Sequence, residues 1–350
     1  MPTEHGSRLF AGRVPDRDAA AVRALRYAGA IVVGKTVTAE LAFLTPGPTR
    51  NPYDLDRTPG GSSMGSAAAV AASVIPGAIG SQTNGSTIRP AAFCGIVGYK
   101  PTGGRLSTAG ALDFSHTLDQ VGVFAGDVAS AARLTAALAG DNLGDWWAGP
   151  SERAPRLAAV RTSEWEAADD VMRTRFQSDV DLLASEGGAI EWPALPDGLD
   201  DVPELIQTVM AYESAQTIGP LAKTRPADVS EKARAIFTRG AGIPKAEYER
   251  AIGDRLRLIA AFNDWAQQYD AILTPATVGE APSLATTGDP RFCSRWTFVG
   301  APAIAIPTGL GPAGLPLGLQ LVGARNADIR LLAAAAWAER LLPRPPRPSL

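Results

Sequence analysis

The segment from Pro59 to Thr102 restricts the folds open to this chain more than any other part of it. Its sequence, PGGSSMGSAAAVAASVIPGAIGSQTNGSTIRPAAFCGIVGYKPT, places Ser62 and Ser86 in small-residue loops, each before an apolar run that fits a helix. Such loops turn sharply and leave backbone N–H groups free to point at one spot, as an oxyanion site requires. Each serine is therefore a candidate nucleophile, provided that a base accepts its proton.

Length and composition indicate a globular chain with a large core. The 350 residues are 45% hydrophobic and 20% charged, which is typical of one large domain or two. A net charge of -3 and scattered basic residues argue against a nucleic-acid partner or an anionic membrane surface. No apolar run reaches the roughly 18 residues of a membrane span, and the N-terminus lacks a signal-peptide core.

The histidines and cysteines narrow the chemistry further. The chain has two histidines, His5 and His116, so a Ser-His-Asp triad or a histidine-rich metal site is poorly supported. We expect His116 to make hydrogen bonds within a loop or the core. Cys94 and Cys293 have neither disulfide nor metal-ligand spacing, which predicts free core thiols in a reduced, cytoplasmic setting.

Hydrophobic periodicity and capping signals predict a mixed α/β chain around a central sheet. The predicted helices cover residues 16–27, 66–74, 127–139, 164–187 and 326–342, with a short helix after Thr38 and mostly polar helices between 200 and 266. The predicted strands cover 30–36, 96–102, 156–161, 189–192, 269–276, 303–310 and 316–324. Loops are predicted at 45–59, 80–85 and 140–155.

The two serine loops have a plain structural alternative, in which both serines only cap helices and shape turns. A phosphate-binding P-loop is disfavoured because the Gly-Lys-Ser/Thr ending is missing, and no G-x-G-x-x-G follows a strand as a dinucleotide site requires. With histidine scarce, a buried lysine of lowered pKa would be a suitable base for serine chemistry.

The amino-acid sequence from Pro59 to Thr102 resembles that of the amidase signature family, and the resemblance extends over almost the whole chain. Its two motifs stand here as Gly60-Gly61-Ser62-Ser63-Met64-Gly65-Ser66 and Gly80-Ser81-Gln82-Thr83-Asn84-Gly85-Ser86. In a Ser-Ser-Lys triad of this kind, Ser86 is the acylated nucleophile and Ser62, 24 residues earlier, is the bridging serine, normally held by a cis peptide. The backbone N–H groups of Thr83, Asn84, Gly85 and Ser86 would form the oxyanion hole.

The resemblance implies one amidase-signature domain over 1–350, an α/β/α sandwich with a large mixed central sheet. Residues 1–140 would form the signature core, 150–270 a variable region that shapes the substrate pocket, 269–341 the C-terminal strands and helix, and 342–350 a tail. Arg89 is expected to pair with an acid near the nucleophile loop.

The chain departs from the family pattern in its base. The family's catalytic lysine lies on a strand, further before the bridging serine than the residues that precede Ser62 here. We therefore expect the catalytic lysine, the first strand and the leading helices to be missing, and activity to be lost or impaired. Lys35 and Lys100 are possible stand-ins, but Lys35 is expected to end a strand and reach for solvent or a loop carbonyl. The family has a lysine at the position of Lys100 alongside its base.

The activity that the resemblance implies is hydrolysis of a carboxamide C–N bond of a small molecule through a Ser86 acyl-enzyme, without metal or cofactor. Two alternatives stay open: a non-catalytic remnant that binds an amide or acyl ligand, and a glutaminase-type subunit of a transamidation complex. A homodimer is also open. An uncovered sheet edge would make the chain prone to aggregation.

Overall fold

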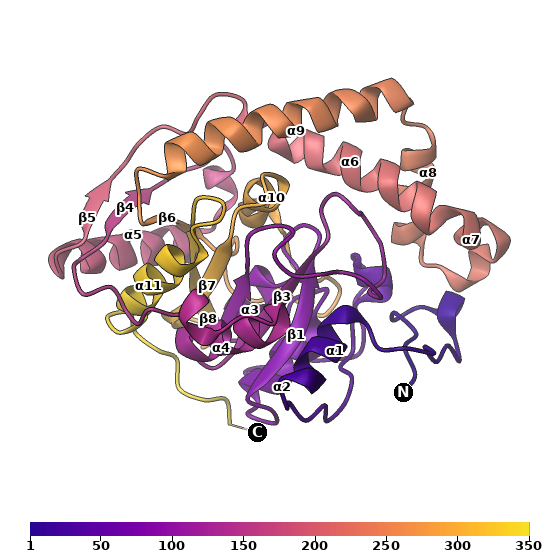
Figure 1. Ribbon diagram of the computed structural model, residues 1–350, viewed down its shortest axis with the longest axis horizontal. Coiled ribbons are helices and arrows are strands. Elements are labelled where there is room, and N and C mark those ends of the chain that lie inside the picture. The colour runs from indigo at the N-terminus through magenta and orange to yellow at the C-terminus, as the bar shows by residue number, and fades with distance from the viewer. Residues whose placement is uncertain (350) are drawn as a thin grey trace.

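One mixed sheet of eight strands forms the centre of the structure (Figure 1). The computed structural model describes residues 1–349, in which the strands lie in the order β1-β3-β2-β7-β8-β6-β4-β5. Their bounds are β1 Gly77–Gln82, β2 Val97–Lys100, β3 Gln120–Ala125, β4 Arg156–Ala159, β5 Ala189–Glu191, β6 Ala271–Pro275, β7 Ala303–Leu310 and β8 Pro316–Val322. Strands β6, β4 and β5 are parallel and the other pairs are antiparallel, so the mixed α/β sheet is confirmed.

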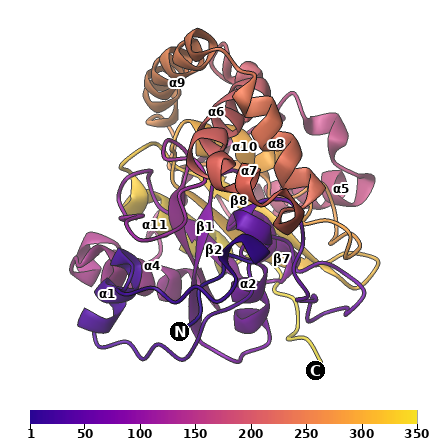
Figure 2. The same cartoon turned by 90° about the vertical axis from the view of Figure 1, so that its right-hand side faces the viewer.

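Helices cover both faces of this sheet and give three layers (Figures 1 and 2). One face carries α2 Met64–Ala71, α3 Ile88–Phe93, α6 Val202–Thr217, α9 Lys245–Ala266 and α10 Arg291–Phe298, with α7 Gly219–Thr224 and α8 Glu231–Ala241 packed on α6. The other carries α1 Ala20–Tyr27, α4 Val128–Ala139, α5 Asp170–Ser185 and α11 Asp328–Glu339. Alternation along β7 divides the two cores, because Ala303 and Ala305 join the first while Ile304 and Ile306 join the second.

The strand predicted at 30–36 is wrong. This segment has no regular secondary structure, and Ile31 and Val33 are 87% and 73% exposed. The sheet ends at β1, and α2 occupies the outer side of that strand. There the Ser66 hydroxyl donates to the Ile79 carbonyl and the Ser63 hydroxyl bonds both backbone groups of Ser81. The apolar run therefore does not pair with the edge of β1, where Ile79 and Ser81 bond side chains at the start of α2.

Other elements also differ from the prediction. Helix α1 begins at Ala20 and not at residue 16, so Asp16 and Asp18 precede it. Residues 77–82 form β1, which leaves a second serine loop of only 83–87. Helix α10 and strand β3 were not predicted, because their sequences carry neither a clear helical stripe nor a strict alternation.

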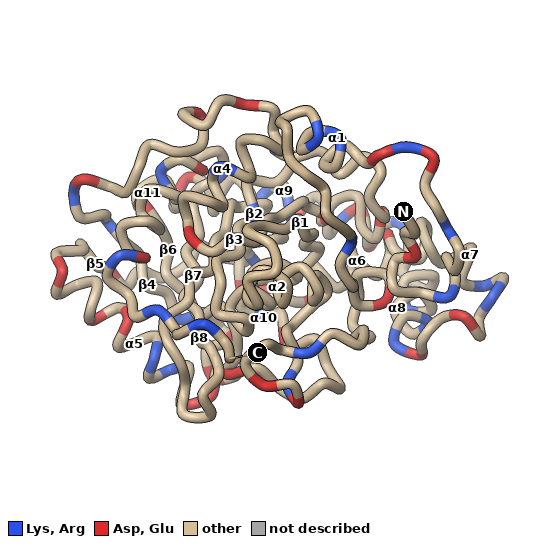
Figure 3. The backbone as a smooth tube through the Cα atoms, turned by 90° about the horizontal axis from the view of Figure 1, so that it is seen from below, with Lys and Arg blue, Asp and Glu red and all other residues tan. Residues whose placement is uncertain are grey.

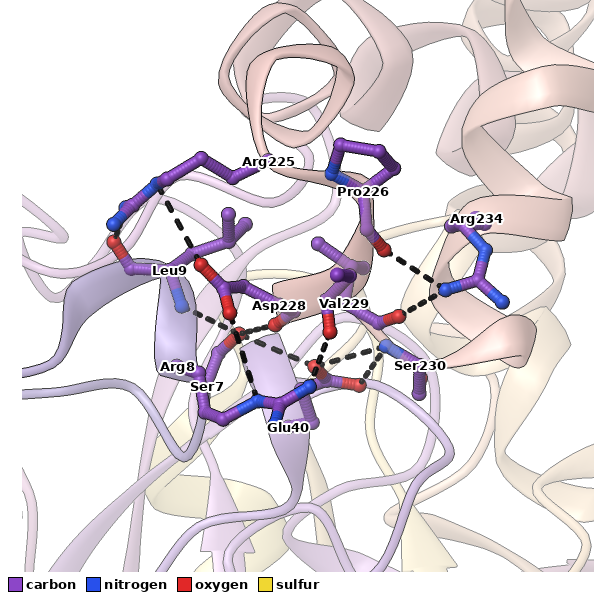
Figure 4. A network of polar contacts seen from close by, with 11 residues as sticks. Ser7, Arg8, Leu9, Glu40, Arg225, Pro226, Asp228, Val229, Ser230 and Arg234 are labelled. Carbon is purple, nitrogen blue, oxygen red and sulfur yellow. Dashed lines mark hydrogen bonds and ion pairs between the residues drawn. The ribbon is translucent and has the colours of Figure 1, made fainter.

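The N-terminal segment is fastened to the helical region by a network of polar contacts around Glu40 (Figure 4). The buried Glu40 carboxylate accepts hydrogen bonds from the Ser7 hydroxyl, at 3.2 Å, and from the Ser230 backbone N–H. Arg8 and Arg225 both pair with Asp228. The network joins two parts of the chain that lie about 200 residues apart, as the sequence separations of its contacts show.

Charged residues of both signs are interspersed along the backbone (Figure 3), consistent with the small net charge of -3. Across residues 1–349, none of the helices combines the length and the apolar character required to cross a bilayer.

Candidate active site

The two serines of the sequence motifs lie in loops that precede α2 and α3. Ser62 is 1% exposed and Ser86 is 7% exposed. The peptide bond between Gly61 and Ser62 is cis, the form that the resemblance implies. The carbonyl of Ser62 accepts hydrogen bonds from the Ala39 backbone N–H, at 3.0 Å, and from the Thr38 hydroxyl, at 3.2 Å. Thr38 therefore holds the Ser62 loop and does not cap a helix.

Glycine and small residues allow the two loops to approach closely. The Ser63 hydroxyl lies 3.2 Å from both the N–H and the carbonyl oxygen of Ser81. A side chain on Gly80 would place its Cβ 2.6 Å from that same hydroxyl, which only glycine avoids. The end of β1 and the start of α2 are consequently fixed against each other, and each carries its serine to the same side of the sheet.

Arg89, which follows Ser86 on α3, bonds the loop that carries Ser62. Its Nη2 donates to the carbonyl of Gly61 at 2.6 Å and its Nε donates to the carbonyl of Thr287 at 2.8 Å. The prediction that Arg89 pairs with an acid is wrong. Among residues 1–349, both of its hydrogen-bond partners are backbone carbonyl oxygens. Burial lowers the pKa of Arg89 to about 10. Its Nη1 has no hydrogen-bond partner among the described residues and faces Gly85, where a Cβ would lie 3.0 Å away.

The loop that leads to Ser86 presents four consecutive free amides. Within residues 1–349, the backbone N–H groups of Thr83, Asn84, Gly85 and Ser86 donate no hydrogen bond. The next two amides do donate hydrogen bonds: the N–H groups of Thr87 and Ile88 both bond the Gln82 side-chain oxygen, at 2.9 and 3.1 Å. Buried backbone donors are ordinarily satisfied, so a run of four free ones is suited to bind an oxyanion.

Side chains from distant elements hold this loop while leaving its amides free. Helix α10 contributes Ser294, whose hydroxyl donates to the Asn84 side-chain oxygen at 2.6 Å, and Thr297, whose hydroxyl donates to the Asn84 carbonyl at 2.5 Å. The Gln82 amide group donates to Thr297 at 2.9 Å. Gln82 and Asn84 belong to the second sequence motif, but the motifs did not indicate Ser294 or Thr297, which are spaced i, i+3 on one helix face.

Asp119 also holds the loop. One of its carboxylate oxygens accepts from the Thr83 hydroxyl at 2.5 Å, and the other accepts from the backbone N–H groups of Phe114 and Ser115 at 2.8 and 3.0 Å. Burial raises the pKa of Asp119 to about 6, against the opposing effect of these hydrogen bonds. Asp119 was not predicted either, because nothing in the local sequence distinguishes it from other loop acids.

Neither serine hydroxyl hydrogen-bonds to a basic side chain within residues 1–349. Lys100 is fully buried, and burial lowers its pKa to about 7. However, its amine donates to Gln120 and to the carbonyls of Pro101 and Ala301, so it is engaged elsewhere. Lys35 is exposed on the irregular segment before α2 and does not end a strand. His116 pairs with Glu213 at 3.1 Å, in agreement with the hydrogen-bonding loop residue we expected.

No group of three or more His, Cys, Asp or Glu side chains in the described part of the chain is arranged to hold a metal ion. Both cysteines are buried and free, and burial raises the pKa of the Cys293 thiol to about 12.

Comparison with known proteins matches this chain to the amidase family model over residues 1–332. The chain belongs to the amidase family. It is 33% identical to a glutamyl-tRNA(Gln) amidotransferase subunit from Symbiobacterium thermophilum, over 97% of this chain and 79% of that protein. The match to the corresponding subunit from Thermotoga maritima has a TM-score of 0.85 at 30% identity, covering 99% of this chain and 83% of that one.

A peptide amidase from Stenotrophomonas maltophilia is also similar in structure, with a TM-score of 0.83, 29% identity and coverage of 100% of this amidase and 81% of the other chain. The relatives thus include both a peptide amidase and a subunit of an amidotransferase. This amidase is therefore an enzyme of the class that cleaves amide bonds, with its two signature serines on the sheet face covered by α2, α3 and α10.

Proposed function

We propose that this amidase hydrolyses the C–N bond of a small carboxamide through an acyl-enzyme on Ser86. The observation that carries the proposal is the run of four free amides from Thr83 to Ser86, which Asp119 and Thr297 hold in place. Arg89, one turn after Ser86, bonds the carbonyl of Gly61, the residue before Ser62. Donors fixed before the reaction stabilise the charge that develops on the carbonyl oxygen, and this effect is commonly the largest single contribution to catalysis.

The reaction assigns one step to each group. The Ser86 oxygen attacks the carbonyl carbon as its proton passes to the Ser62 oxygen and the Ser62 proton passes on to the amide nitrogen, while the four amides receive the oxyanion. As the C–N bond breaks, the nitrogen leaves with a proton delivered through Ser62. Water then attacks the acyl carbon, releases the carboxylic acid and restores the Ser86 hydroxyl.

Within residues 1–349, no basic side chain hydrogen-bonds to Ser62 to serve as the base of this reaction. The five lysines of the chain are engaged or remote, since Lys100 is committed to three acceptors and the others lie on the exposed segment or on helices α7 to α9. We therefore expect slow turnover, with Ser86 reactive but weakly activated. Loss of one member of a triad can cost about 10⁴-fold in rate and still leave catalysis from the oxyanion hole.

A glutaminase-type role is the second candidate, and the 33% identity to an amidotransferase subunit supports it. Glutamine is itself a carboxamide, so the same serine chemistry would release ammonia. A panel that contains glutamine, aliphatic amides, aryl amides and peptide amides separates the two roles by relative rate.

A fluorophosphonate probe tests the proposal, with the modified residue identified by mass spectrometry. We expect the label on Ser86 and none in Ser86→Ala, while Ser62→Ala reacts at least tenfold more slowly. Ser107→Ala, in an exposed loop, is the matched control and should react like the parent chain. Labelling that persists in Ser86→Ala, or a parent chain that is not labelled, contradicts the proposal.

A further inference from the structure

A loop of six residues, 114–119, contacts two parts of the structure. One is the free-amide loop, residues 83–86, and the other is the helical region formed by α6 and α9. Asp119 carries the only carboxylate of residues 114–119. This carboxylate accepts a hydrogen bond from the Thr83 hydroxyl at 2.5 Å. Thr83 is the first of the four residues with free amides, so the hydrogen bond of its side chain to Asp119 anchors the start of the free-amide loop. A hydrogen bond from a hydroxyl to a carboxylate is of the short, strong kind.

Asp119 is itself rigidly held. Its second oxygen accepts from the backbone N–H groups of Phe114 and Ser115, and its own N–H donates to the Ser115 carbonyl at 2.8 Å. Leu118 and Phe114 in the same loop are buried. The carboxylate thus occupies one position relative to the loop, and the Thr83 hydroxyl meets an acceptor that is already in place.

The far side of the loop is bound to helix α6 and helix α9. The fully buried Glu213 of α6 accepts from the Ser115 hydroxyl and from both the N–H and the hydroxyl of Thr117. It also accepts from the Tyr248 hydroxyl of α9 at 2.7 Å and pairs with His116. A displacement of Asp119 would break several of these contacts, so the helical region fixes the loop that fixes Thr83.

We infer that Asp119 is a positioning residue that sets the orientation of the Thr83–Ser86 amides through the Thr83 hydroxyl. The inference rests on the proposed function, because it assigns those amides to an oxyanion. It differs from a purely structural role in predicting that loss of the contact slows reaction at Ser86 more than it weakens noncovalent binding of the amide.

Four variants isolate the contact. Asp119→Ala and Thr83→Val remove it, whereas Asp119→Asn and Thr83→Ser keep a partner for each group, since an amide can donate to the threonine oxygen. Asp113→Asn, an exposed acid beside the loop, is the matched control. Two readouts are needed: the rate of fluorophosphonate labelling at Ser86, split into affinity and maximal rate, and hydrogen exchange of the amides of Thr87, Ile88 and Arg89.

We expect Asp119→Ala and Thr83→Val to lower the maximal labelling rate about tenfold or more, with little change in affinity. They should also raise amide exchange at 87–89 severalfold, because the bonds to Gln82 and Gly85 lie just beyond the loop. The conservative variants and the control should stay near the parent values. Unchanged exchange in both Asp119→Ala and Thr83→Val overturns the inference.

The exchange measurement does not depend on reaction at Ser86, so it separates the two failures. A parent chain that is not labelled, but whose exchange responds to Thr83→Val and is rescued by Thr83→Ser, contradicts the proposed function and leaves the positioning role supported. A labelled parent whose maximal rate and exchange are both indifferent to the four variants retains the function and refutes the role of Asp119.

Discussion

Arg89 and Gly61 are joined by a 2.6 Å hydrogen bond from the guanidinium Nη2 to the backbone carbonyl, across 28 residues of sequence. Because Gly61 precedes Ser62 and Arg89 follows Ser86 by one helical turn, this bond fixes the two serine loops relative to each other. The second bond of Arg89, to the Thr287 carbonyl, anchors the pair to the segment that leads into α10.

Replacement of Arg89 by lysine should damage the site more than the fold. An ammonium cannot reach both carbonyls in the forked geometry of a guanidinium, so one buried acceptor loses its partner, at a cost of about 1–3 kcal/mol. We expect a matching loss in urea unfolding and labelling of Ser86 that is at least tenfold slower. Arg173→Lys, on the surface of α5, should change neither quantity; an Arg89→Lys chain with parent labelling would refute the bridging role.

Thr297 should be replaceable by serine but not by valine. Its hydroxyl donates to the Asn84 carbonyl and accepts from the Gln82 amide, so Thr297→Val leaves two buried polar groups unpaired in a nearly isosteric side chain. We expect Thr297→Val to lower the free energy of unfolding by about 1–3 kcal/mol and to slow labelling of Ser86. Equal stability and labelling in Thr297→Val and Thr297→Ser would show that the hydroxyl does not support the loop.

Asp179 predicts a pH dependence of stability. Burial raises its pKa to about 7, although Arg175 lies 3.6 Å away and opposes the shift. The folded chain therefore binds this proton more tightly than the unfolded chain, and the contribution of Asp179 to stability falls as the pH rises from about 4 to about 7. Asp179→Asn should be more stable than the parent at pH 8, by a few kcal/mol at most at about 1.4 kcal/mol per pKa unit.

That advantage should shrink as the pH is lowered and vanish near pH 4, as measured by thermal unfolding at several pH values. The exposed Asp181 of the same helix gives the control, since Asp181→Asn should show no such trend. A difference between Asp179→Asn and the parent that is constant with pH would contradict the raised pKa.

The exposed apolar segment before α2 should drive self-association. Tyr27, Ile31 and Val33 are 94%, 87% and 73% exposed and lie within seven residues of one another. An apolar patch of this kind favours contact between copies. We expect Ile31→Glu with Val33→Glu to lower the associated fraction in sedimentation velocity, with little effect on the melting temperature.

Leu256→Glu, at an exposed position on α9, is the matched control. If the control and the double variant lower the associated fraction equally, or if neither changes it, the exposed segment is not the cause of self-association.

Local sequence predicted those helices and strands that can be recognised without knowing which other parts of the chain they contact. The run at 303–310 became β7 with the expected ends, because a continuous apolar stretch bounded by Pro and Gly fits a strand buried on both faces. Asp127 caps α4 through the Ser130 N–H, as a side-chain acceptor before an apolar run suggests. The segment 30–36 is also a short apolar run, but side chains at the start of α2 bond the edge of β1 in its place. That arrangement depends on tertiary contacts, which local sequence does not reveal.

The site divides in the same way. Ser62 and Ser86 were identified because their motifs are continuous in sequence. Asp119, Ser294 and Thr297 reach the free-amide loop from 36, 210 and 213 residues away, and no local pattern marks a residue whose partner is so distant. Arg89 was singled out, but its partners are backbone carbonyls, which sequence does not distinguish from any others.

The structure of the phosphonylated chain is the most direct test of the central claim, that Ser86 and the four amides after β1 form one reaction centre. We predict phosphorus bonded to the Ser86 oxygen, with a nonbridging oxygen about 2.7–3.1 Å from amide nitrogens of Thr83 to Ser86. A phosphorus on another residue, or an adduct on Ser86 whose oxygens all point away from those amides, would contradict the account.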